Sequence, residues 1–212
     1  MSALNLELYL VTDRELARRP LEQVVESALQ GGVTLVQLRE KNCSTREFIG
    51  IAESIHALCR RFNVPLIIND RVDVAQAVDA EGVHLGQSDM PAETARAILG
   101  AEKIIGLSVE SVEDARQAED EDVDYLGVSP IFFTPTKTDL QRELGLEGLR
   151  QIKAFTRHPL VGIGGLSAAN AAAVIRAGAD GIAVVSAICG ADDPKHAAQQ
   201  LRRIIREAKE RR

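Results

Sequence analysis

The sequence repeats one pattern along most of its length: a short apolar run ends in polar residues, and a stretch with helical spacing of apolar residues follows. Counted in this way, the 212 residues hold about eight β-then-α units joined by short connections. Short internal similarities support a repeating unit, since Glu81, Asp124 and Asp180 each stand directly before an apolar run. This number of units favours a closed barrel over an open doubly wound sheet. We therefore predict an α/β protein in which residues 1–212 form a single (β/α)₈ TIM barrel domain.

The stretch from Thr34 to Lys41 shows the pattern most clearly. It begins as an apolar strand and then places Gln37, Arg39 and Lys41 at every second position, so these side chains leave the same face of an extended backbone. A solvent-exposed strand end would show the same alternation. Because helical segments flank the strand, we favour a strand end that points its polar side chains into a crevice. The residues expected beneath the helices are Leu35, Val36 and Leu38.

Polar residues end the other predicted strands as well. In a (β/α)₈ barrel the carboxyl ends of the strands meet at one mouth, which holds the active site. Asn69 and Asp70 have a simpler alternative role, which is to cap the helix that begins near Arg71. His84, in the middle of a strand, is interpreted as a hydrogen-bonded core histidine. The residues predicted at the mouth are Gln37, Arg39, Lys41, Asn69, Asp70, Asp89, Ser108, Thr134, Thr136, Lys137, Gly165 and Ser186.

Composition argues against several classes of function. The net charge is −6 and aromatic residues make up 3%, with no Trp, so neither broad electrostatic binding of nucleic acid nor base stacking is expected. The chain has no apolar run of membrane-spanning length and no signal-peptide features at its N-terminus, which predicts a cytoplasmic protein. Cys43, Cys59 and Cys189 lack metal-ligand spacing and are expected to be free thiols. The sequence leaves a homo-oligomer open.

The residues predicted at one side of the mouth suit a diphosphate and a metal ion. Arg39 can bridge two phosphate oxygens with its planar guanidinium group, while Lys41 and Lys137 are compact cations. Asp70 and Asp89 follow neighbouring strands and could hold Mg²⁺, which takes one or two carboxylates and completes its shell with water and phosphate oxygens. Cations beside a pair of carboxylates indicate a diphosphate substrate.

A separate anion site is predicted on the other side of the mouth. Gly165 ends the seventh strand, and Val185 and Ser186 follow the eighth, where barrels commonly bind phosphate through backbone N–H groups. One mouth with two anion sites indicates two phosphorylated small-molecule substrates.

Taken in order, these motifs resemble the thiamine phosphate synthase family. Each motif is weak alone, but the ordered set covers nearly the whole chain and is highly specific. The matching segments are Gln37-Leu-Arg-Glu-Lys41, Asn69-Asp-Arg-Val-Asp-Val, Gly82-Val-His-Leu-Gly-Gln-Ser-Asp89, Pro130-Ile-Phe, Thr134-Pro-Thr-Lys137, Gly162-Ile-Gly-Gly and Val185-Ser-Ala-Ile.

The resemblance implies a transferase that joins hydroxymethylpyrimidine diphosphate to a thiazole phosphate, carboxylated or not, and releases thiamine phosphate and diphosphate. It also implies a Mg²⁺-assisted, dissociative reaction: diphosphate leaves first, and the thiazole nitrogen captures a pyrimidine carbocation. In this family pattern the metal ligands would be Asp70 and Asp89.

The family pattern also assigns the substrate contacts by position. The pyrimidine diphosphate would contact Gln37, Leu38, Arg39, Glu40, Lys41, Asn69, Ser108 and Lys137. The thiazole phosphate would contact Thr134, Pro135, Thr136, Gly165, Val185 and Ser186. The catalytic residues among these would be Arg39, Lys41, Lys137 and Ser108.

The chain departs from the commoner family pattern at Glu110, Ser129 and Phe133, where many members have His, Gly and Pro. None of these departures removes a charged site residue. They bear on the fit around the pyrimidine and on the stiffness of residues 133–144, which we predict to be a lid.

Two other functions are compatible with the same barrel. A related thiazole tautomerase is expected to carry His where this chain has Pro130 and to lack the segment that ends in Lys137, so the synthase is favoured. A non-catalytic sensor of a thiamine precursor would have little need for the carboxylate pair, Asp70 and Asp89.

Overall fold

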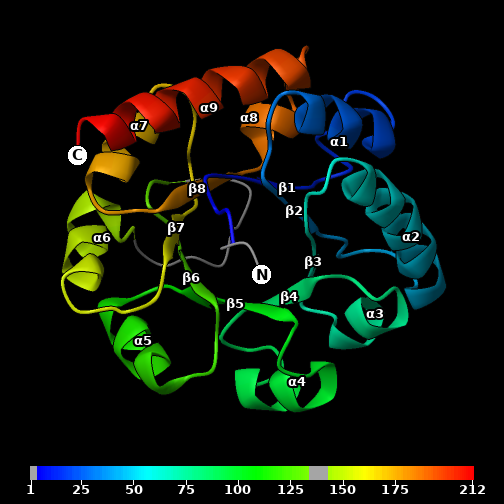
Figure 1. Cartoon of the computed structure of the whole chain (residues 1–212), viewed down its shortest axis with the longest axis horizontal. Helices are drawn as coiled ribbons and strands as arrows, with labels where there is room; N and C mark the ends of the chain where they lie inside the picture. Colours follow the sequence, from blue (N-terminus) through cyan, green and yellow to red (C-terminus); the bar gives the residue numbers. More distant parts are fainter. Residues whose placement is uncertain (1–3, 134–142) are drawn as a thin grey trace.

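The computed structural model describes residues 4–133 and 143–212, and their strands close into a parallel barrel in sequence order, β1 to β8. Figure 1 looks along the barrel and shows the helices as a ring around the strands. The predicted (β/α)₈ fold is therefore confirmed. The strands are β1 (Leu8–Val11), β2 (Leu35–Leu38), β3 (Leu66–Asn69), β4 (Gly82–Leu85), β5 (Ile104–Val109), β6 (Tyr125–Val128), β7 (Leu160–Gly162) and β8 (Gly181–Val184).

A helix follows each strand, and most of these helices are short, which is how a chain of 212 residues completes the barrel. One helix that the sequence pattern did not predict, α8, lies directly after β8. The helices are α1 (Leu21–Gln30), α2 (Thr45–Arg61), α3 (Val72–Ala77), α4 (Ala92–Leu99), α5 (Val112–Gln117), α6 (Gly145–Lys153), α7 (Ala171–Arg176), α8 (Ser186–Cys189) and α9 (Pro194–Glu210), with a 3₁₀ turn, η1 (Ala118–Asp120), after α5. None of the helices in the described ranges is long and apolar enough to cross a membrane.

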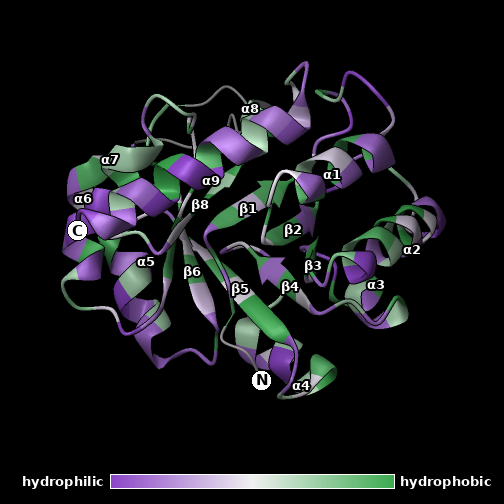
Figure 2. Ribbon diagram, turned by 45° about the horizontal axis from the view of Figure 1, so that its top comes forward, coloured by the Kyte–Doolittle hydropathy of each residue, from purple (hydrophilic) through white to green (hydrophobic). Residues whose placement is uncertain are grey.

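The core has two layers, one between strands and helices and one inside the barrel. Figure 2 shows apolar residues along the strands and on the sides of the helices that face them. Val36 and Leu38 pack in the outer layer, as predicted. Leu35 does not, because it lies on the same strand face as Gln37 and packs inside the barrel. The expectation that Leu35 faces the helices was therefore wrong.

The start of α3 decides between two roles for Asn69, the last residue of β3, and Asp70, which follows it. At α2 the side chain of Ser44 caps the helix, accepting the N–H of Glu47 at 3.2 Å. At α3 the N-cap residue is Arg71, and no side chain caps the helix. The capping alternative for Asn69 and Asp70 is therefore not realised, and both residues line the cavity at the mouth.

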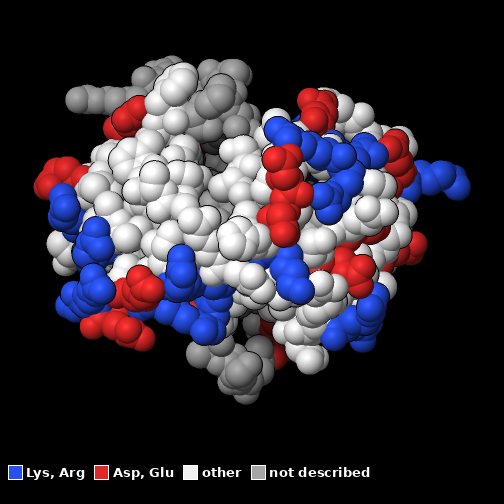
Figure 3. Space-filling view, turned by 90° about the horizontal axis from the view of Figure 1, so that it is seen from above, with Lys and Arg blue, Asp and Glu red and all other residues white. Residues whose placement is uncertain are grey.

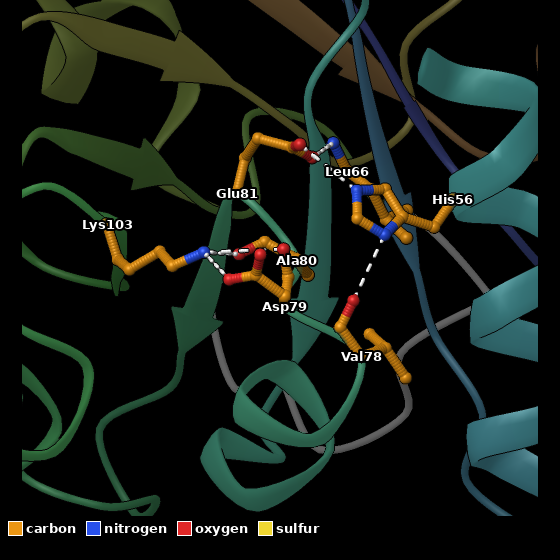
Figure 4. Close-up of polar contacts among 7 residues, drawn as sticks. All are labelled: His56, Leu66, Val78, Asp79, Ala80, Glu81 and Lys103. Carbon is orange, nitrogen blue, oxygen red and sulfur yellow. Dashed lines mark hydrogen bonds and ion pairs between the residues drawn. The ribbon is translucent and has the colours of Figure 1, made fainter. Parts of the chain in front are cut away.

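Side chains at the amino end of the barrel tie neighbouring strands together. Glu81, directly before β4, accepts the N–H of Leu66, the first residue of β3, at 2.8 Å through Oε2. Its Oε1 lies 3.0 Å from Nε2 of the buried His56, whose Nδ1 lies 3.1 Å from the carbonyl of Val78 (Figure 4). His56 thus has a structural role at the amino end of the barrel.

The same arrangement recurs before each even-numbered strand, and we call these contacts the strand clamps. Each clamp satisfies a buried backbone N–H near the start of the preceding odd-numbered strand. The clamps join Thr34 Oγ1 to Leu8 N (3.0 Å), Glu81 Oε2 to Leu66 N (2.8 Å), Asp124 Oδ2 to Ile105 N (2.8 Å) and Asp180 Oδ2 to Leu160 N (2.9 Å). The acids that appeared in the sequence as echoes of a repeating unit are three of these clamps.

We expect Asp124→Ala to lower the free energy of unfolding by about 1–3 kcal/mol, because it leaves the buried N–H of Ile105 without its acceptor. Asp122 is a matched control: its Oδ2 lies 3.1 Å from Nε of Arg96, without hydrogen-bond geometry, and its side chain is 76% exposed. Asp122→Ala should cost less than about 0.5 kcal/mol. Urea denaturation followed by circular dichroism measures both, and equal losses would contradict the clamp.

Candidate active site

A cavity of about 490 Å³ opens at the carboxyl ends of the strands. It brings together most of the residues that the sequence predicted at the mouth. Those that line it are Gln37, Arg39, Lys41, Asn69, Asp70, Asp89, Ser108, Gly165, Val185 and Ser186. Thr134, Pro135, Thr136 and Lys137, with most of the predicted lid, lie outside the described residues.

Two residues of the 37–41 segment turn away from the cavity. Leu38 is fully buried in the outer core layer. Glu40, whose side chain is 5% exposed, makes an ion pair with Arg14 at 3.0 Å. Burial raises the pKa of Glu40, and Arg14 opposes that rise. Glu40 thus joins the β2–α2 loop to the β1–α1 loop.

The predicted metal ligands lie side by side. Asp70 adopts a left-handed backbone conformation, with φ of 61°, at the end of β3. Asp89 accepts the N–H of Gly86 at 2.7 Å through Oδ2. The pKa of Asp89 is raised, first by burial and then by the neighbouring carboxylate of Asp70, while the Gly86 N–H and Lys41 oppose the rise. Two carboxylates in contact make this corner of the cavity attract a cation.

This corner has the donor set that Mg²⁺ uses. Mg²⁺ is commonly held by one or two carboxylates, with water and substrate phosphate completing its shell. Within residues 4–133 and 143–212 no group of three or more His, Cys, Asp or Glu forms a self-sufficient metal cage. The ammonium group of Lys41 lies 2.6 Å from Oδ2 of Asp70, so one of the two carboxylates is already in an ion pair with a cationic side chain. The residues present therefore fit a divalent ion whose coordination shell is completed by water and substrate phosphate.

The opposite side of the cavity is built from backbone. Gly165, after β7, has φ of 62°, and a Cβ there would lie 2.6 Å from the carbonyl oxygen of Phe133. Glycine is therefore required for this close approach. Ser186 is the first residue of α8, where N–H groups have no acceptor within the helix. The cavity thus has a carboxylate and cation side at β2–β4 and an amide side at β7–β8.

The floor of the cavity is built from residues that no sequence motif indicated. Tyr9 and Tyr125 are fully buried and line it from β1 and β6. Their phenol oxygens lie 2.9 Å apart. The missed signal was a hydroxyl-bearing ring in a strand buried on both faces, since such a hydroxyl needs a partner. His84 is hydrogen-bonded in the core, as predicted, and also lines the cavity.

Charge on the outside of the molecule is mixed. On the face shown in Figure 3, Lys and Arg side chains are interspersed with Asp and Glu instead of forming one basic surface. Among the described residues many charged side chains are paired, as in the ion pair between Lys153 and Asp180 at 3.2 Å. The polar groups that distinguish this barrel are therefore those of its mouth.

A closed (β/α)₈ barrel with this cavity at its carboxyl-terminal mouth defines an enzyme of the TIM-barrel class. Residues 8–188 match the family described as thiamine monophosphate synthase, and the chain belongs to that family. As the resemblance implied, it is a transferase of thiamine biosynthesis.

Individual relatives align with this sequence over almost its full length. The chain is 56% identical to the thiamine-phosphate synthase of Albidiferax ferrireducens over 201 residues, which is 94% of this chain and 92% of that protein. It is 53% identical to the enzyme of the same name from Chloroflexus aurantiacus over 205 residues, covering 96% and 94% of the two chains. The solved structure of thiamine phosphate pyrophosphorylase from Pyrococcus furiosus superposes with a TM-score of 0.90 at 45% identity, covering 97% and 98%.

We expect Asp89→Asn to stabilise the metal-free protein. Because the folded-state pKa of Asp89 is raised above 3.8, the carboxylate destabilises the fold above that raised pKa and has no effect well below 3.8. The variant should therefore gain on the order of 1 kcal/mol at neutral pH, the scale of two charges about 4 Å apart in water, and nothing in acid.

Denaturant unfolding in EDTA at several pH values measures this gain. Asp192→Asn is the control, because the side chain of Asp192 is 88% exposed. A gain that persists in acid, or an equal gain in the control, would contradict a carboxylate at position 89 that is destabilised by burial and by Asp70.

Proposed function

We propose that this chain is a thiamine phosphate synthase that condenses hydroxymethylpyrimidine diphosphate with a thiazole phosphate and releases diphosphate. The observation that carries the proposal is the division of one cavity into two sides. Arg39, Lys41, Asp70 and Asp89 face the cavity from β2 to β4, and the Gly165 loop lies across from them. This arrangement supports two anionic substrates held facing each other.

In this proposal Asp70 and Asp89 would hold Mg²⁺ against the diphosphate. When bound, Mg²⁺ would supply positive charge to offset the negative charge that grows on the leaving diphosphate. The ammonium group of Lys41 lies 2.6 Å from Oδ2 of Asp70. When substrate binds, this ammonium group would pair with a diphosphate oxygen in place of the carboxylate. Arg39 faces the same cavity and offers a planar fork of N–H donors. Lys137 is assigned to the same half-site from the sequence.

The reaction requires no side-chain nucleophile. Diphosphate leaves first, and the positive charge on the pyrimidine methylene is then captured by the thiazole nitrogen. Gly165, Val185 and Ser186 would hold the thiazole phosphate through backbone N–H groups and so fix the direction from which its nitrogen approaches. Catalysis in this scheme comes from charge stabilisation by the cations and from alignment of the two substrates.

Diphosphate release tests the proposal. Purified protein mixed with the pyrimidine diphosphate, the thiazole phosphate and Mg²⁺ should release diphosphate and form thiamine phosphate in equal amounts. Either substrate alone should give neither product, and EDTA should abolish both. Thiazole isomerisation without the pyrimidine substrate would favour the tautomerase instead, and tight binding of both ligands without turnover would favour the sensor.

Asp89→Asn tests the metal assignment. We expect the variant to need a higher Mg²⁺ concentration for half-maximal rate and to turn over more slowly, because one of the two carboxylates is lost. Its affinity for the thiazole phosphate should stay the same, since that substrate is assigned to the β7–β8 side. The two effects are separated by Mg²⁺ titration of the rate and by calorimetric binding of the thiazole phosphate. An unchanged rate at limiting Mg²⁺ would refute the assignment.

A further inference from the structure

A chain of hydrogen bonds crosses the floor of the cavity from one side of the barrel to the other. Nε2 of Gln37 donates to Oη of Tyr9 at 2.8 Å. The two phenol oxygens, of Tyr9 and Tyr125, lie 2.9 Å apart. Nδ1 of His84 lies 3.0 Å from Oη of Tyr125, and its Nε2 lies 2.9 Å from Oγ of Ser108. The two ends of this hydrogen-bond chain, Gln37 and Ser108, are residues that the family pattern assigns to the pyrimidine diphosphate.

The rings in the middle are held in place by packing. His84 and Tyr125 stack with centroids 5.5 Å apart, and Tyr9 meets Tyr125 edge to face at 6.0 Å. A Cβ at Gly106 would lie 2.2 Å from Cζ of Tyr125 and 2.5 Å from Nδ1 of His84, so only glycine leaves room for this pair. Burial raises the pKa of both tyrosines. Each phenol therefore keeps its proton and has one hydrogen to donate.

The available donors and acceptors allow one direction for the hydrogen-bond chain. An amide N–H can only donate, so Tyr9 accepts from Gln37 and gives its own proton to Tyr125. Tyr125 then donates to Nδ1 of His84, which leaves the ring proton on Nε2, where it is donated to Ser108. The opposite direction would leave the phenol proton of Tyr9 without an acceptor in this chain, which is costly for a buried group.

We propose that Tyr9, Tyr125 and His84 are positioning residues. The two tyrosines fix His84 as the Nε2–H tautomer, and His84 in turn orients the hydroxyl of Ser108. In this arrangement the Ser108 hydroxyl accepts from His84 and turns its own proton toward the cavity. The amide oxygen of Gln37 is correspondingly left to act as an acceptor. The cavity therefore presents one set donor and one set acceptor to a substrate. The role of this donor and acceptor in binding substrate rests on the proposed function, whereas the tautomer of His84 does not.

The tautomer is measured directly by long-range ¹H–¹⁵N correlation NMR of histidine-labelled protein, without substrate. We expect the unmodified protein to carry the His84 proton on Nε2, and a proton on Nδ1 would overturn the proposal. Gln37→Glu should reverse the chain, because an ionised carboxylate only accepts. Tyr9 would then donate to it, Tyr125 to Tyr9, and His84 to Tyr125, which moves the ring proton to Nδ1.

Gln37→Leu is the matched control for this reversal, because it removes the amide without supplying an acceptor and should leave the proton on Nε2. The spectra are compared at a pH where the carbon shift of the new Glu side chain shows that it is ionised. An unchanged tautomer in Gln37→Glu under that condition would contradict a chain with a set direction. If Gln37→Glu does not fold, the tautomer of the unmodified protein still decides the question.

Kinetics test the positioning role. Tyr125→Phe breaks the chain in its middle and keeps the ring, and we expect kcat/KM for the pyrimidine diphosphate to fall about tenfold or more. KM for the thiazole phosphate should not change. Thr34→Val is the control, because it removes a buried hydrogen bond to Leu8 at the far end of the barrel and should lower only the melting temperature.

Equal kinetic constants in Tyr125→Phe and unmodified protein would overturn the positioning role. If instead the tautomer behaves as expected but the unmodified protein does not turn over the two substrates, the hydrogen-bond chain stands and the proposed function fails.

Discussion

The strand clamps are the constraint on which the rest of this structure depends. A closed parallel barrel buries the beginnings of its strands, and each buried N–H there must find an acceptor. The side chains of Thr34, Glu81, Asp124 and Asp180 supply acceptors, one before every second strand. Because each joins the beginnings of two strands, it helps to set which residues of those strands lie opposite one another. The register then decides which side chains face inward at the other end.

That other end carries groups that work against stability. Asp70 and Asp89 repel each other, and Asp70 also adopts a left-handed conformation that a side-chain-bearing residue seldom takes. The barrel tolerates this because its stabilising contacts lie elsewhere, in the clamps and in the two core layers. The separation of a stabilising amino end from a polar carboxyl end is general in this fold and follows from the direction of the strands.

Local pattern was enough to predict much of this arrangement. The alternation in Gln37, Arg39 and Lys41 correctly places all of them on the cavity, since side chains two apart on a strand share a face. The same rule places Leu35 inside the barrel, and the helices that flank the strand do not change this. The acids at Glu81, Asp124 and Asp180 were visible as a repeat, while Thr34, which has the same role without a charge, was not.

The sequence by itself determined the barrel and many of the polar residues that line its mouth, because both follow from periodicities within single segments. Only the tertiary structure decided which side chains touch. Tyr9 and Tyr125 are 116 positions apart, and Lys41 and Asp70 are 29 apart. Neither pair has a local signature, because each exists only once the strands have closed and set their register. The same holds for the direction of the hydrogen-bond chain, which depends on every partner being in place.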